Sequence, residues 1–119
     1  MRLHYIEMKD GLRLIKLVGR LDINGVNQIE STLIGHCNAD NLRVAIDLSK
    51  VSFLSSIGIP MLINAARLVG RRGGKIAFIS PQGNVASVLD VTGISSMVPI
   101  HPDLETAQAK TLVESAVSS

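Results

Sequence analysis

Two adjacent serines, Ser55 and Ser56, are the residues of this sequence whose position could support a chemical event. They stand between the apolar run 51–54 and Ile57, where a helix-like pattern begins. A serine at a helix N-terminus can cap the helix by accepting a backbone N–H. The same position tolerates a phosphate, because the helix N-terminus carries a partial positive charge and free N–H donors. The residues alone favour a helix cap, but one serine suffices for that and the second is left unexplained.

Enzymatic chemistry has little support in the sequence. The three histidines, His4, His36 and His101, share no metal-ligand spacing. No G-x-S-x-G motif surrounds the serines, "GRRGGK" lacks the spacing of a phosphate-binding loop, and "LVGRLDING" lacks the dinucleotide pattern G-x-G-x-x-G. No close pair of acids stands out. We therefore expect a protein that is not an enzyme, with no catalytic residue, metal or cofactor.

The composition indicates one α/β domain over residues 1–119. The hydrophobic share is 46%, and only 3% of the residues are aromatic, which fits an aliphatic core and argues against a protein that stacks bases. The formal net charge is +2, and the only basic cluster, at 70–75, is best explained as a solvated helix end. We expect no direct nucleic-acid partner.

The single cysteine, Cys37, rules out an internal disulfide and fits a reducing compartment. Its place on an apolar helix face predicts a core residue rather than a reactive thiol. No apolar run is long enough to span a bilayer, and the first residues do not have the layout of a signal peptide. These observations predict a cytoplasmic location without a membrane partner.

Strands and helices alternate along the chain. Strands at 2–8 and 12–18 flank Asp10-Gly11, a strong hairpin signal. Asn24 is the expected cap of a helix over 24–37. The later elements are a strand within 41–49, a helix that follows the serines and ends before Gly73-Gly74, a strand at 75–80, a short helix before Gly93, a short strand at 97–101, and a last helix capped by Asp103. This order predicts a mixed sheet of about five strands with an N-terminal antiparallel hairpin, and about four helices.

The segment around the serines resembles a known family pattern. "DLSKVSFL" at 47–54 and "SSIGI" at 55–59 resemble D-L-S-x-V-x-F followed by D-S-S/T-G-L, the motif of STAS domains of bacterial anti-sigma factor antagonists. The family's G-x-L-D is similar to "GRLD" at 19–22, and its S-P-x-V segment is similar to "SPQGNVASVLDVTGI" at 80–94. "HPDLETAQA" at 101–109 is similar to the start of the family's last helix, so the resemblance covers essentially the whole chain.

The resemblance implies a binding module that switches partners. Members bind an anti-sigma factor with serine kinase activity; phosphorylation of one serine breaks the complex, and a PP2C-type phosphatase restores it. The acceptor aligns with Ser56, with Ser55 as the alternative. The residues implied in partner binding are Asp22, Asn24, Ser55, Ser56, Ile57, Gly58 and Ile59. A weak homodimer stays open, as does a STAS interaction module in another complex: a stressosome-like assembly, a two-component or chemosensory circuit, or a lipid-transport ABC system.

Three departures from the pattern lie at the serines. Ser55 stands where the family has Asp, Ile57 stands where Ser or Thr would follow the acceptor, and Pro60 stands where Gly is frequent. Proline lacks an N–H and disfavours the α conformation in the residue before it. We therefore expect an irregular or late helix start, with a local kink that keeps Ser56 exposed.

Overall fold

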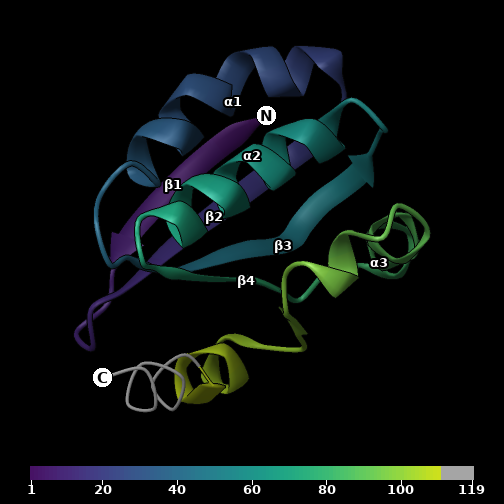
Figure 1. The fold of residues 1–119 in the computed structure, drawn as a ribbon. Helices are drawn as coiled ribbons and strands as arrows, with labels where there is room; N and C mark the ends of the chain where they lie inside the picture. Colours follow the sequence, from purple (N-terminus) through teal and green to yellow (C-terminus); the bar gives the residue numbers. More distant parts are fainter. Residues whose placement is uncertain (111–119) are drawn as a thin grey trace.

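The computed structural model describes residues 1–110, which contain a five-stranded mixed sheet in the order β1-β2-β3-β4-β5 (Figure 1). The first pair is antiparallel and the other three pairs are parallel. The strands are β1 (Arg2–Glu7), β2 (Leu12–Leu21), β3 (Arg43–Leu54), β4 (Lys75–Ile79) and β5 (Ile100–His101). The predicted fold class, with its N-terminal antiparallel hairpin, is confirmed.

Helices cover both faces of this sheet (Figure 1). One face carries α1 (Ile23–His36), α2 (Gly58–Arg71) and α3 (Gly83–Val91), and the main core lies beneath them around the fully buried Ile46 and Phe78. The opposite face carries a smaller cluster in which Leu14 and Ala45 pack with Ala107, from the helix that begins at residue 104. A short 3-10 helix, η1 (Ile94–Ser96), follows α3.

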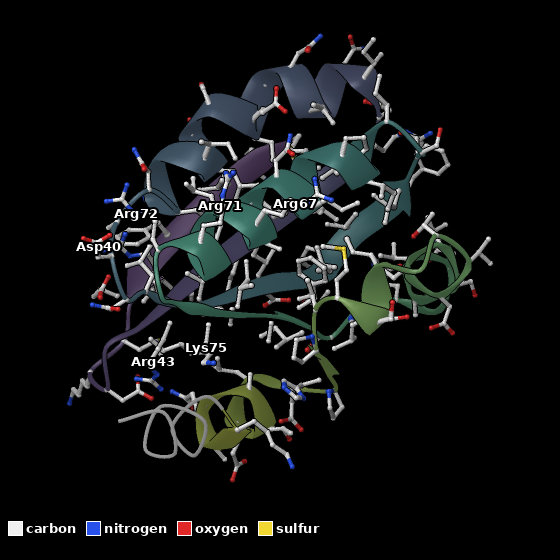
Figure 2. All side chains as sticks on the ribbon, viewed as in Figure 1. Asp40, Arg43, Arg67, Arg71, Arg72 and Lys75 are labelled. Carbon is white, nitrogen blue, oxygen red and sulfur yellow. The ribbon has the colours of Figure 1, made fainter. Side chains whose placement is uncertain are left out.

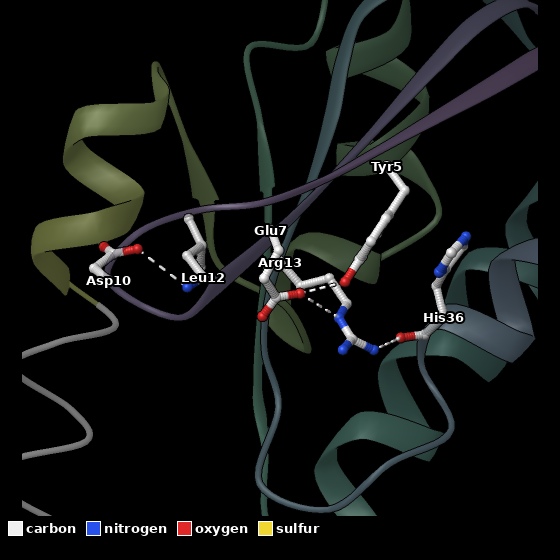
Figure 3. A network of polar contacts seen from close by, with 6 residues as sticks. All are labelled: Tyr5, Glu7, Asp10, Leu12, Arg13 and His36. Atoms are coloured by element: carbon white, nitrogen blue, oxygen red, sulfur yellow. Dashed lines mark hydrogen bonds and ion pairs between the residues drawn. The ribbon is translucent and has the colours of Figure 1, made fainter.

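A polar network ties the hairpin to the end of α1, on the face of the sheet that carries this helix (Figure 3). The Arg13 guanidinium lies 3.2 Å from the Glu7 carboxylate and donates to the carbonyl of His36 at 2.9 Å. Tyr5 donates a hydrogen bond to Glu7, and its ring stacks on the His36 imidazole at a centroid distance of 4.4 Å. The edge strand β1 is therefore fixed to the helical layer as well as to β2.

The sequence-based boundaries were wrong at three strands. The last strand was expected over 97–101, but β5 contains only Ile100 and His101. The second strand was expected to end at Val18, but β2 continues through Leu21. The third was placed within 41–49, whereas β3 runs for 12 residues to Leu54. Register shifts between Lys16 and Val18 and between Gly19 and Arg20 let the two strands stay paired over this length. The ends of β2 and β3 consequently lie side by side.

Other expectations are confirmed within the described residues. Asp103 accepts the N–H of Thr106 at 2.7 Å and so caps the last helix, whose predicted portion after residue 110 lies outside the described part. Cys37 is fully buried, and this burial raises the pKa of its thiol to about 11, as suits a core residue. In the same part of the chain, no helix combines the length and apolar character needed to cross a membrane.

Candidate functional site

The two serines form the turn between β3 and α2, and neither caps the helix. Helix α2 begins at Gly58, its N-cap residue is Ile57, and no side chain among residues 1–110 bonds to its first N–H groups. The expectation of a serine cap is therefore wrong. The Ser55 hydroxyl instead donates to the carbonyl of Leu21 at 3.0 Å, and the Ser55 N–H donates to the same carbonyl at 3.1 Å. Ser55 thus fastens the end of β3 to the end of β2.

The hydrogen bond from Ser55 to Leu21 depends on the serine that stands where the family has Asp. A serine hydroxyl can donate to a carbonyl, whereas an ionised aspartate only accepts. The Ser55 side chain is half-buried between the two strand ends, and the Ser55 carbonyl accepts the Gly58 N–H at 3.0 Å. An aspartate could not make the contact with Leu21 that this serine makes.

Ser56 has the opposite environment. Its side chain is exposed and makes no hydrogen bond with any residue in the described part of the chain. The late helix start is confirmed and has a physical reason: Pro60 has no N–H to donate to the Ser56 carbonyl, so a helix that began one residue earlier would lack that bond. With Ile57 as N-cap, Pro60 falls in the first turn, where its missing N–H costs nothing.

Asp22, not Asn24, caps the neighbouring helix α1. The Asp22 Oδ1 accepts the N–H of Gly25 at 2.9 Å, and its Oδ2 lies 3.6 Å from the Arg20 guanidinium. The hydrogen bond from the Gly25 N–H lowers the pKa of Asp22 below its ordinary 3.8. Partial burial raises this pKa, whereas the positive charge of Arg20 lowers it further. Since Leu21 pairs with Leu54 across the strands, this cap stands next to the serine turn.

Three exposed apolar side chains surround this corner of the molecule. Ile23 is 56% exposed, Ile57 is 44% exposed and Phe53 is 36% exposed. The Arg20 guanidinium lies 4.3 Å from the centre of the Phe53 ring. Exposed apolar side chains that gather in one place mark interaction sites more often than singly scattered ones do. We use the term Ser56 surface for Asp22, Ile23, Asn24, Phe53, Ser56 and Ile57.

The sequence-predicted site residues divide between surface and core. Asn24, Ser56 and Ile57 are exposed and Asp22 is partly exposed, whereas Gly58 and Ile59 are buried. A Cβ atom at Gly58 would lie 2.4 Å from a methyl carbon of Leu21, so this glycine allows α2 to approach the strand ends. Gly58 and Ile59 position the turn and do not face outward.

Ile23 and Phe53 were not predicted as site residues. Ile23 lies three residues before Val26, so helical periodicity alone would turn it toward the core with Val26, Ile29 and Leu33. In the structure it is the first residue of α1 and lies beyond the end of the sheet. Phe53 belongs to the quoted motif "DLSKVSFL", which is the only signal that could have indicated it.

The Asp22 cap predicts a specific dependence of stability on pH. Because the native carboxyl titrates below 3.8, its contribution is complete above that pH and is lost as the pH falls through the lower native pKa. An Asp22→Asn variant keeps a cap that does not titrate. Between about pH 7 and about pH 2 the native chain should lose more stability than Asp22→Asn in urea unfolding followed by circular dichroism.

The control for this prediction is Asp22→Ala, which removes the cap at every pH. It should be the least stable of the three proteins at neutral pH. The difference between its free energy of unfolding and that of the native chain should shrink in acid. Other carboxyl groups titrate equally in all three proteins, so the differences between them isolate Asp22. An unchanged difference between the native chain and Asp22→Ala across this range would contradict the assignment.

Comparisons with known proteins agree with this fold. The STAS domain family model matches residues 5–107. The chain is 22% identical over 99 residues to the anti-sigma F factor antagonist of Paenibacillus polymyxa, covering 81% of this chain and 85% of that protein. It superposes on the crystal structure of an anti-sigma factor antagonist from Mycobacterium paratuberculosis with a TM-score of 0.78 at 25% identity, over 92% of this chain and 94% of that one.

A third similar protein has been solved in two chemical forms. SpoIIAA of Bacillus, at 18% identity, superposes in its unphosphorylated form with a TM-score of 0.74, over 92% of this chain and 95% of that one. In its phosphorylated form the TM-score is 0.66, over 92% of this chain and 98% of that one. At this level of identity the likeness establishes the shared fold.

Proposed function

This chain belongs to the STAS domain family, and on that premise we propose that it is an anti-sigma factor antagonist switched by phosphorylation of Ser56. Its partner would be an anti-sigma factor that also acts as a serine kinase. A PP2C-type phosphatase would restore the active form. The names of the similar proteins support the general role, and SpoIIAA, solved with and without phosphate, supports the switch.

The observation that carries this proposal is the difference between the two serines. Ser56 is exposed and unbonded within the described part of the chain, so its hydroxyl is accessible to a kinase. The Ser55 hydroxyl is half-buried and engaged with the Leu21 carbonyl. Phosphorylation of Ser55 would break that bond and force a dianion between two strand ends. Ser56 is therefore the better acceptor of the two.

In the proposed step, the Ser56 oxygen attacks the γ-phosphorus of ATP held by the kinase, ADP leaves, and the hydroxyl proton passes to a base of the kinase. The product carries roughly two negative charges at neutral pH. The nearby N-terminus of α2 has no acidic residue in its first turn and no side-chain cap, so its partial positive charge can accommodate the phosphate. The fold would then persist while the Ser56 surface, which already carries the Asp22 carboxylate, becomes more negative.

The test is phosphorylation with ATP by a purified anti-sigma factor that has serine kinase activity, followed by peptide mass spectrometry. We expect phosphate on Ser56 in the native chain and in Ser55→Ala, and none in Ser56→Ala. The variants matter because adjacent serines are hard to distinguish by fragmentation alone. Comparable modification of Ser56→Ala would assign the acceptor to Ser55 and refute the proposed site.

A further inference from the structure

A groove lies between α1 and α2, toward the end of α2 that is remote from Ser56. Its volume is about 500 Å³, and two half-buried aliphatic residues, Ile34 and Leu68, line it. The other lining residues are exposed and polar: Asn38, Asn64, Arg67 and Arg71. Helix α2 rises about 20 Å from Gly58 to Arg71 at 1.5 Å per residue. The groove is therefore a surface separate from the one proposed above.

Two cations at this groove have no acidic partner in the described part of the chain. Other arginines of the described part do form ion pairs. Arg72 lies 3.1 Å from Asp40, and Arg43 lies 3.6 Å from Asp10. Arg67 and Arg71 take part in none of the ion pairs or side-chain hydrogen bonds between the described residues. Figure 2 places both on α2, with Arg72 at its end and Lys75 at the start of β4. The positive charge of this face is therefore only partly neutralised.

A solvated helix end accounts for only part of this pattern. Arg71 lies in the last turn of α2, where a cation favours the helix dipole. Arg67 lies one turn earlier, and like charges four residues apart on a helix repel each other. Both guanidinium groups flank a groove whose inner residues are aliphatic. This combination complements a chain that carries carboxylates on either side of an apolar side chain.

We propose that the α1–α2 groove docks an acidic amphipathic segment of a partner protein. Carboxylates of the segment pair with Arg67 and Arg71, and an apolar side chain packs on Ile34 and Leu68. Arginine suits this role because its planar fork binds a carboxylate through two parallel hydrogen bonds. The inference does not depend on the proposed function, since the Ser56 surface stays free when the groove is filled.

The lining favours a protein segment over other polyanions. None of the described residues that line the groove is aromatic, although aromatic stacking is the usual means of holding single-stranded nucleic acid. The large apolar residues exposed in the described part, such as Val91 and Met97, are not in the groove, so it offers little to insert into a lipid layer. The amide of Asn64 can donate and accept, which matches a peptide backbone. The Asn38 Oδ1 already accepts from the Arg72 guanidinium at 3.1 Å, which leaves the Asn38 amide group to donate.

The test is a titration of the isotope-labelled chain, followed by NMR, with two synthetic helix-forming peptides. One carries glutamates around a leucine, and the other has glutamine at every glutamate position. The acidic peptide should shift the signals of the six lining residues. Its affinity should fall severalfold between about 50 mM and about 300 mM salt, because exposed charges are screened. The glutamine peptide should bind at least about tenfold more weakly.

Substitutions locate the effect. The double variant Arg67→Glu, Arg71→Glu should bind the acidic peptide at least about tenfold more weakly, and Arg67→Gln, Arg71→Gln serves if the charge reversal prevents folding. The control is Arg2→Glu, which reverses an exposed charge on β1 and should leave the affinity within about twofold. Equal binding of the two peptides, or signal shifts away from the groove, would overturn the proposal.

Two further arms identify other occupants. A DNA duplex that shifts the groove signals and binds more tightly than the acidic peptide would assign the surface to nucleic acid. Phosphatidylglycerol vesicles that bind through Arg67 and Arg71, with no response to the peptide, would assign it to a lipid surface. Either result would overturn docking of an acidic protein segment.

Discussion

Ser56→Asp is expected to weaken binding to the anti-sigma factor at least about tenfold, equivalent to about 1.4 kcal/mol, while Ser56→Ala stays within about threefold of the native chain. The carboxylate would lie among Ile23, Phe53 and Ile57 and close to the charge of Asp22. A partner that covers these apolar side chains would have to remove water from an unpaired charge. Alanine leaves a neutral surface and should be tolerated.

The magnitude is a lower limit for the phosphorylated chain. Aspartate brings one negative charge, whereas phosphoserine brings nearly two and a larger hydration shell. The free N-terminus of α2 offsets part of this charge, by about 0.3–1 kcal/mol, which keeps the modified chain folded without restoring the interface. Isothermal titration calorimetry with the purified anti-sigma factor measures the affinities of the native chain, the Ser56 variants and the phosphorylated chain on one scale.

The matched control is Ser31→Asp, which adds the same charge at an exposed position of α1. It should change the affinity by less than about threefold, because a charge that remains in water costs little. Since Ser56 is exposed and unbonded in the described part, both of its variants should unfold within about 0.5 kcal/mol of the native chain. An equal loss of affinity in Ser31→Asp would mean that net charge, and not the Ser56 surface, controls binding.

The sequence predicted the exposure of Ser56 and the late start of α2, but not the contacts around them. The motif at 47–59 indicated Ser56, and the absent N–H of Pro60 predicted the late start of α2 and the exposure of that serine. The partner of Ser55 could not be predicted, because it is a carbonyl 34 residues away in sequence. Only the pairing of β2 with β3 brings Leu21 to the serine turn, and long-range pairing is not encoded in local propensity.

The cap of α1 illustrates the same limit. Asp22 and Asn24 are both favoured N-cap residues, and local preference cannot choose between them. The choice follows from Gly25, which lets the first turn of α1 sit against the carbonyl of Arg20 at the end of β2. Because of this contact the helix begins at Ile23, and Asp22 is its N-cap residue. Ile23 is therefore exposed, although its helical spacing matches that of the buried Val26, Ile29 and Leu33.

Gly25→Ala is therefore expected to lower the free energy of unfolding by about 2 to 3 kcal/mol, the largest effect of a single methyl group that we predict. A Cβ atom at this position would lie 2.1 Å from the carbonyl oxygen of Arg20. Because that oxygen belongs to the backbone, it cannot rotate away as a side chain could. Relief of the clash requires α1 to move away from the end of β2, which would disturb Leu21 and the bond from Ser55.

The matched control is Gly35→Ala in the same helix. Apart from the adjoining backbone of α1, no atom of the described residues lies within 4 Å of the corresponding Cβ position. Alanine there should therefore raise stability by about 0.5–1 kcal/mol by restricting the unfolded chain. Urea unfolding of the two variants should thus move the midpoint in opposite directions. NMR signals of Ser55 and Ser56 should shift in Gly25→Ala only. Equal stability of the two variants would mean that α1 is not locked to the strand end, and the geometry inferred for the Ser56 surface would then lack its support.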